Sequence, residues 1–288
     1  MNYEVTHTTE YGYGEAVSVS HHLLHLNPRE LPGQKCGLYQ LIVDPPPAVT
    51  TKRVDYFGNT VTFLAMQGPY ERLTVQTRSK VTVSPARLPD PAATPAWETV
   101  IDQGELPLDV FEFVFDSPLV RPGAELAAYT APSFPPGRPL IEAVVDLTAR
   151  IHEDFTFDPK ATTVATPLAE VFKARRGVCQ DFAHLEIACL RSLGLAARYV
   201  SGYLETVPPP GKPRLVGADA SHAWMAVYCP DSGWIDVDPT NNLLPSDTHI
   251  TLAWGRDYSD VSPIRGVILG GGEDTLKVAV DIVRLDKE

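Results

Sequence analysis

The hydrophobic pattern of this chain changes from the period of strands to that of helices and later back again, and these changes determine which fold classes are open to it. Up to about Val83, apolar and polar residues alternate in short runs rich in Val, Thr, Tyr and Phe, as expected of half-buried strands. The runs lie at residues 3–7, 16–20, 39–43, 52–57, 60–64, 71–77 and 80–83. Gly58-Asn59 predicts a hairpin turn between two of them. Because no helical pattern separates the runs, residues 1–85 are predicted to form an antiparallel β-sandwich.

Prolines dominate the next segment, and a helical period follows it. Residues 86–135 are predicted to be a stiff Pro-rich linker followed by irregular short pieces. An apolar stripe that runs from Leu140 to Phe155 then predicts an amphipathic helix. Further helices are predicted over residues 167–173 and 179–193, the second ending at Gly194, a residue type that commonly caps helices.

Strand patterns return after Gly194. They cover residues 197–205, 223–229 and 234–237, and residues 275–285 predict one more strand near the end of the chain. Helices followed by strands indicate an α+β core over residues 136–265, with residues 266–288 as a C-terminal strand segment.

Cys179 begins the predicted helix at 179–193. A helix N-terminus carries a partial positive charge and unpaired N–H groups, and both favour a thiolate over a thiol. A thiolate is the reactive form of cysteine, so Cys179 is predicted to be a nucleophile. Its backbone N–H would hold an oxyanion formed during attack on a carbonyl, with the Gln180 side chain as a further candidate donor.

His222 and Asp238 lie on the two strands of a predicted hairpin. If the hairpin is symmetric about residue 230, the two side chains face each other on one side of the sheet, close enough for an Asp–imidazole hydrogen bond. Such a carboxylate orients the ring and supports its protonated form. A one-residue slip in register would place the two side chains on opposite faces. With Cys179, the pair predicts a Cys-His-Asp catalytic triad of papain-like logic.

Several motifs resemble the bacterial transglutaminase-like superfamily. They are Gly-Val-Cys-Gln-Asp-Phe-Ala-His from 177, Ala-Arg-Tyr-Val-Ser-Gly-Tyr from 197, Ser-His-Ala-Trp-Met-Ala-Val-Tyr from 221 and Gly-Trp-Ile-Asp-Val-Asp-Pro-Thr-Asn from 233. The β-rich first 85 residues resemble the region that precedes this core in bacterial members. The resemblance implies a papain-like, transglutaminase-like core with Cys179 as nucleophile, His222 as base and Asp238 as the orienting carboxylate.

The chemistry implied by the resemblance is acyl transfer from an amide through a thioester, to water or to an amine. Hydrolysis of peptide or isopeptide bonds is slightly favoured, because water is always present and no amine pocket can be read from the sequence. There are two alternatives. One is a true transglutaminase with an amine acceptor, and the other is a peptide-binding module that kept the fold without the activity. Trp224 is expected to lie either in the core or in the wall of the substrate cleft, and Tyr203 is expected to line the cleft.

Charge and composition limit the partners. The formal net charge of -12 argues against nucleic acid and anionic membrane surfaces, which both require a basic surface. No apolar run is long enough to span a bilayer, and the N-terminus does not resemble a signal peptide, so we expect a cytoplasmic protein with a peptide or protein substrate. No metal-ligand cluster or D-x-D-x-D-G loop occurs, so no metal, calcium or other cofactor is expected.

Overall fold

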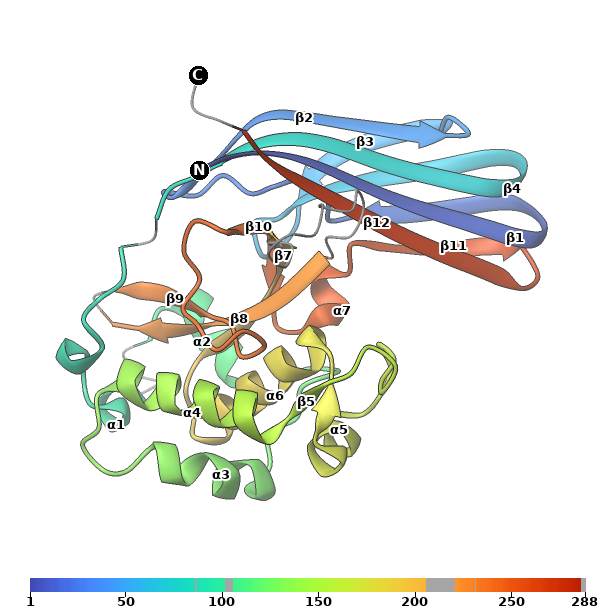
Figure 1. Ribbon diagram of the computed structural model, residues 1–288. Helices are drawn as coiled ribbons and strands as arrows, with labels where there is room; N and C mark the ends of the chain where they lie inside the picture. Colours follow the sequence, from blue (N-terminus) through green and yellow to red (C-terminus); the bar gives the residue numbers. More distant parts are fainter. Residues whose placement is uncertain (86, 102–105, 206–220, 231, 286–288) are drawn as a thin grey trace, which may run out of the picture.

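The computed structural model describes residues 1–85, 87–101, 106–205, 221–230 and 232–285. Within these residues, two antiparallel sheets and a set of helices lie in layers (Figure 1). The four-stranded sheet lies between the six-stranded sheet and the helices (Figure 1). The α+β class expected from the sequence is therefore confirmed. No helix in the described part of the chain is long and apolar enough to cross a membrane.

The six-stranded sheet is built around two long strands. Its members are β1 (Asn2–Leu24), β2 (Gln34–Asp44), β3 (Val49–Val54), β4 (Thr60–Val83), β11 (Ile264–Gly270) and β12 (Asp274–Leu285). β1 and β4 pair with each other, β2 and β3 pair with β4, and β11 and β12 pair with β1. Register shifts between Gly12 and Val19 let β1 bend without leaving the ladder. Alternating runs that look separate in the sequence are therefore parts of single strands.

The C-terminal strand joins the N-terminal sheet. The strand predicted at 275–285 is confirmed as β12, which pairs with β1 along residues 2–13. Tyr3 and Val5 of β1 and Val280 of β12 are buried against Tyr203 and Ile250 of the four-stranded sheet. The N-terminal sheet is thereby packed directly on the core.

The segment between the first sheet and the core contains short helical pieces. They are η1 (Pro91–Ala93), α1 (Trp97–Val100), α2 (Leu108–Phe111), η2 (Glu112–Val114), α3 (Ala124–Thr130) and η3 (Ala131–Ser133). Val100, Leu126 and Phe134 are buried in the main hydrophobic core. The proline-rich stretch therefore covers the core as well as connecting two parts of the chain.

The three predicted helices are confirmed. They are α4 (Leu140–Asp154), α5 (Leu168–Ala174) and α6 (Cys179–Ser192), with the two-residue strands β5 (Thr156–Phe157) and β6 (Arg176–Gly177) between them. The apolar stripe of α4 is buried except for Val145, which is 38 % exposed. Gly194 follows α6 with a φ of 85°, as expected of a glycine that ends a helix.

The four-stranded sheet has the order β10-β7-β8-β9. Its strands are β7 (Ala197–Leu204), β8 (Ser221–Cys229), β9 (Gly233–Val237) and β10 (His249–Gly255), and α7 (Tyr258–Val261) follows them. α6 packs on β7 and β8, on the face that carries Tyr199, Met225 and Val227. The start of α6 is thereby brought to the sheet that holds His222.

Candidate active site

Cys179 is the first residue of α6 and is half-buried. The turn before it is fixed by Asp181, whose Oδ2 accepts the backbone N–H of Val178 at 2.8 Å and the hydroxyl of Thr162 at 2.6 Å. Gly177 leaves room for this carboxylate, because a Cβ there would lie 2.6 Å from the same oxygen. Asp181 therefore shapes the loop that presents the thiol. At the first helical position, the N–H of Cys179 has no partner within the helix and is available to a ligand.

His222 and Asp238 are in contact, although the hairpin register differs from the one assumed. In the observed hairpin, Cys229 pairs with Gly233 and Met225 pairs with Val237. The assumed hairpin set His222 opposite Asp238, so the observed register is shifted from it by two residues. A shift of two residues keeps both side chains on the same face, because side chains alternate with period two. His222 Nε2 donates to Asp238 Oδ2 at 2.8 Å.

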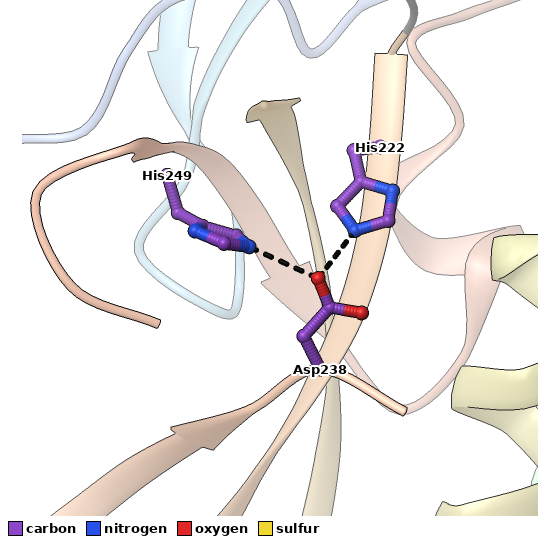
Figure 2. Close-up of side chains that lie close together, drawn as sticks. All are labelled: His222, Asp238 and His249. Atoms are coloured by element: carbon purple, nitrogen blue, oxygen red, sulfur yellow. Dashed lines mark hydrogen bonds and ion pairs between the residues drawn. The ribbon is translucent and has the colours of Figure 1, made fainter. Parts of the chain in front are cut away.

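Asp238 is fully buried and accepts five N–H groups. Figure 2 shows its Oδ2 between the rings of His222 and His249. His249 Nε2 donates to Oδ2 at 3.0 Å and Asn241 Nδ2 at 2.7 Å. Oδ1 accepts the backbone N–H groups of Thr240 and Asn241 at 3.0 and 3.2 Å. This set of donors holds the carboxylate in a single orientation.

The electrostatics of the site favour a protonated His222. Burial alone lowers the pKa of His222, but its contacts with Asp238 and the neighbouring Cys179, with their negative charges, outweigh burial and raise the pKa to about 9. Burial also opposes the charge on Asp238, yet the hydrogen bonds from His222 and His249 hold the pKa of Asp238 well below its usual range. The arrangement therefore favours an imidazolium next to Cys179 and an ionised carboxylate behind it.

The structure thus brings together the three residues predicted to form the triad. His249 and Asn241 were missed by the sequence reasoning. Asn241 lies three residues after Asp238, where an Asx-type turn is a local signal. His249 begins β10, which pairs with β7 across a long sequence separation, so no local pattern points from it to Asp238.

Trp224 lies in the core, one of the two placements expected for it, and does not line a cleft. It is 0 % exposed and its ring packs near His222 and edge-on to His249 at a centroid distance of 5.1 Å. Gly202 makes this packing possible, because a Cβ there would lie 2.4 Å from the Trp224 ring and 2.2 Å from the Ile250 carbonyl oxygen. Trp224 therefore supports the two histidines from within the protein.

Tyr203, in contrast, is placed differently from the expectation. It is 1 % exposed, and its hydroxyl lies 2.9 Å from His7 Nδ1, at the junction with the six-stranded sheet. Because its hydroxyl is buried there, Tyr203 cannot contact a substrate from a cleft. Gln180 lies next to Cys179 and is half-buried, and its amide makes a long hydrogen bond of 3.5 Å to the Val164 carbonyl.

A buried carboxyl group lies on the same helix as Cys179. Glu186 is 0 % exposed, its Oε1 accepts the Thr148 hydroxyl at 2.7 Å, and its Oε2 has no hydrogen-bond partner. Burial raises the pKa of Glu186 to about 8, despite the hydrogen bond from Thr148. Glu186 is therefore neutral in the folded protein at neutral pH.

Replacing Glu186 with glutamine is expected to reduce the loss of stability as pH rises. The unfolded chain releases this proton near its ordinary pKa of 4.5, whereas the folded chain keeps it to about 8. The unfolded state binds fewer protons in that window, so stability falls as pH rises through it, by on the order of a few kcal/mol. Urea unfolding at several pH values within the window measures the slope. The exposed control Glu170→Gln should keep the wild-type slope, and an equally steep slope in Glu186→Gln would contradict the assignment.

The atoms around Asp238 are of types that also bind metals. His222 Nε2, Asp238 Oδ2 and His249 Nε2 all lie within 4.8 Å of one another. Two imidazoles and a carboxylate suit a transition metal. However, Oδ2 already accepts three N–H donors, one of them from the Asn241 amide, and a metal ion would have to displace them. The hydrogen-bonded arrangement satisfies these atoms without an ion, and the absence of a metal stays a prediction.

Comparisons with known proteins agree with this geometry. Residues 3–82 match the bacterial transglutaminase-like N-terminal region, and residues 128–239 match the transglutaminase-like superfamily. The second match includes Cys179, His222 and Asp238 but ends before Asn241 and His249. A solved structure of a candidate cysteine protease from Cytophaga hutchinsonii has the same fold, with a TM-score of 0.78, 21 % identity and coverage of 100 % of this chain and 92 % of that chain.

Sequence relatives match this chain over nearly its full length or over part of it. An uncharacterized protein of Mycobacterium tuberculosis is 43 % identical over 290 residues, covering 98 % of this chain and 92 % of the relative. A protein-glutamine gamma-glutamyltransferase of Pseudomonas aeruginosa is 33 % identical over 134 residues, which are 41 % of this chain and 20 % of the relative. With both sheets, the helices and the Cys-His-Asp contacts in place, the chain belongs to the transglutaminase-like superfamily and carries the bacterial N-terminal region of that family.

Proposed function

We propose that this protein is a cysteine-dependent acyl-transfer enzyme that acts on peptide or isopeptide amide bonds through a thioester. The observation that carries the proposal is the buried contact of His222 with Asp238, beside a half-exposed Cys179 at a helix N-terminus. Nε2 of the His222 ring is hydrogen-bonded to Asp238, which leaves Nδ1 to exchange a proton with Cys179. In this proposal Cys179 is the nucleophile, His222 the general base and acid, and Asp238 the orienting carboxylate.

The proposed reaction has two halves. The Cys179 thiolate attacks the amide carbonyl carbon, and the N–H of Cys179, with the Gln180 amide as a candidate second donor, holds the oxyanion. The C–N bond breaks as the imidazolium of His222 gives its proton to the leaving nitrogen, so ammonia or an amine departs and a thioester remains. In the second half, neutral His222 takes a proton from water or an incoming amine. The new bond to the acyl carbon forms and the C–S bond of the thioester breaks, so the Cys179 thiolate leaves and the thiolate and imidazolium are restored.

Water is the acceptor we favour. The carboxylate that the structure places next to Cys179, that of Asp181, is already engaged by the Val178 N–H and the Thr162 hydroxyl, and water needs no binding pocket. Amine transfer is the second candidate, because a relative that matches 41 % of this chain is a protein-glutamine gamma-glutamyltransferase. A peptide-binding module without activity would not require the set of donors around Asp238.

The acyl-enzyme provides the test. The protein is incubated with a pool of glutamine- and asparagine-containing peptides in ¹⁸O water, with and without a labelled alkyl amine, and the products are read by mass spectrometry. We expect a hydroxylamine-sensitive acyl adduct on Cys179 and a product carboxylate that carries one ¹⁸O. Incorporation of the amine with release of ammonia would instead assign amine transfer. Peptides bound but unchanged, with no adduct on Cys179, would contradict the enzymatic proposal.

A further inference from the structure

The geometry points to His249 as a positioning residue of the proposed catalytic set, one that fixes Asp238 so that Asp238 can orient His222. The inference rests on the proposed roles of Cys179, His222 and Asp238. It adds a residue outside the part of the chain that matches the transglutaminase-like superfamily, which ends at residue 239.

The contacts of His249 fix both of its ring nitrogens. Nε2 lies 3.0 Å from Asp238 Oδ2, and Nδ1 lies 3.1 Å from the Thr248 hydroxyl. Because an ionised carboxylate only accepts, Nε2 carries the proton and Nδ1 accepts from Thr248. His249 is 4 % exposed, and Trp224 packs edge-on against its ring. With both nitrogens occupied and the ring buried, His249 does not reach a substrate.

Asp238 requires support of this kind because of its place in the chain. It follows Val237, the last residue of β9, so it lies outside the regular part of the hairpin. Its Oδ2 serves His222, and His249 approaches the same oxygen from a different strand (Figure 2). The other donors to Asp238 besides His222 come from Thr240 and Asn241, in the turn that directly follows it. His249 adds a donor from a separate strand, so the position of Oδ2 is also fixed relative to β10.

The strand that carries His249 is itself held by the six-stranded sheet. Gln34 donates from Nε2 to the Thr251 carbonyl and accepts the Thr251 N–H at Oε1, both at 2.8 Å. Gln34 thus pairs with β10 as a strand would, two residues from His249. The N-terminal sheet thereby holds the strand from which His249 contacts Asp238.

The test measures Cys179 and needs no knowledge of the substrate. The rate of alkylation of Cys179 by iodoacetamide is followed against pH, by mass spectrometry of its peptide, in wild type, His249→Gln and His249→Phe. Glutamine can place an amide N–H near the position of Nε2, whereas phenylalanine fills the space without a donor. We expect His249→Gln to resemble wild type. In His249→Phe the midpoint of the profile should move about one pH unit towards alkaline, with a roughly tenfold slower rate on the acid side.

A double-mutant cycle separates positioning from a general structural effect. In an Asp238→Asn background, His249→Phe should have no further effect on the profile, because the group that it positions is already lost. His22, also 4 % exposed but within β1, gives the matched control: His22→Phe should leave the profile unchanged even if it lowers the melting temperature. A shift of equal size in the Asp238→Asn background would overturn the inference.

The remaining outcomes are also distinct. An unchanged profile in a folded His249→Phe protein would overturn the role of His249 while leaving the proposed function intact. A wild-type profile that matches a free cysteine in solution would instead count against the proposed function itself. Treatment of the wild-type protein with EDTA could instead shift its alkylation profile towards that of His249→Phe. That result would assign His249 to a metal site and overturn its role as a positioning residue.

Discussion

Replacing Cys179 with alanine is expected to abolish acyl transfer, with a loss on the order of 10⁴-fold or more. Of the other described thiols, Cys36 lies on β2 of the six-stranded sheet, where burial raises its pKa, and Cys229 is 0 % exposed. Cys189 is 0 % exposed on the same helix as Cys179, and burial raises its pKa to about 12. A thiolate at that site is not accessible at neutral pH. The measurement is labelling by a peptide-based electrophile that targets thiols, together with turnover of any peptide found to be a substrate.

The matched control is Cys189→Ala, which removes a thiol from the core of the same helix. It should keep full labelling at Cys179 and lose only some stability, because a small buried side chain is shortened. Equal labelling of wild type and Cys179→Ala would show that the probe reacts elsewhere, and the nucleophile assignment would be wrong.

Replacing His222 with alanine is expected to lower turnover by roughly 10²–10⁴-fold, the usual contribution of a general base and acid. It should also change the pH dependence. The pKa of His222 is raised to about 9, so the imidazolium that pairs with the thiolate persists below that pH and is lost above it. Wild-type activity should therefore fall as the pH passes about 9, and this alkaline limb should be absent from the residual activity of His222→Ala.

His184 provides the control for that experiment. It lies on α6 five residues after Cys179, but its Nε2 accepts the Tyr258 N–H at 3.1 Å and burial lowers its pKa to about 4. His184→Gln keeps an acceptor for that N–H and should retain the alkaline limb. If His184→Gln loses the limb and His222→Ala keeps it, the two roles are exchanged.

The placement of Cys179 and the contact of His222 with Asp238 could be predicted because their evidence is local. Cys179 starts a helix whose apolar pattern is plain in the sequence, and His222 and Asp238 are separated by one short hairpin. The assumed register was displaced by two residues, yet the prediction of a shared face survived, because only an odd displacement moves a side chain to the other face.

Other features of the site depend on contacts that no local pattern encodes. His249 reaches Asp238 only because β10 lies beside β7, and Trp224 is buried because Gly202 on the neighbouring strand leaves space for its ring. Tyr203 alternates correctly as a strand residue, but which face meets the six-stranded sheet is decided by the packing of one sheet on the other. The strands that carry Trp224 and Tyr203 were predicted, whereas β10, which carries His249, was not. In each case the neighbour across the sheet was not available from the sequence.

The pairing of β12 with β1 has a topological consequence. Asn2 is opposite both Thr82 and Leu285, so the chain leaves the six-stranded sheet after β4 and returns to it through β11 and β12. The transglutaminase-like core is therefore an insertion within the sheet rather than a module appended after it. A single cut after Val83 would remove β11 and β12 and strip β1 of its outer neighbours, leaving a row of open backbone groups. A circular permutant would join the chain termini, next to the paired residues Asn2 and Leu285, and would place the new termini in a loop of the core. It would preserve every one of these strand pairings.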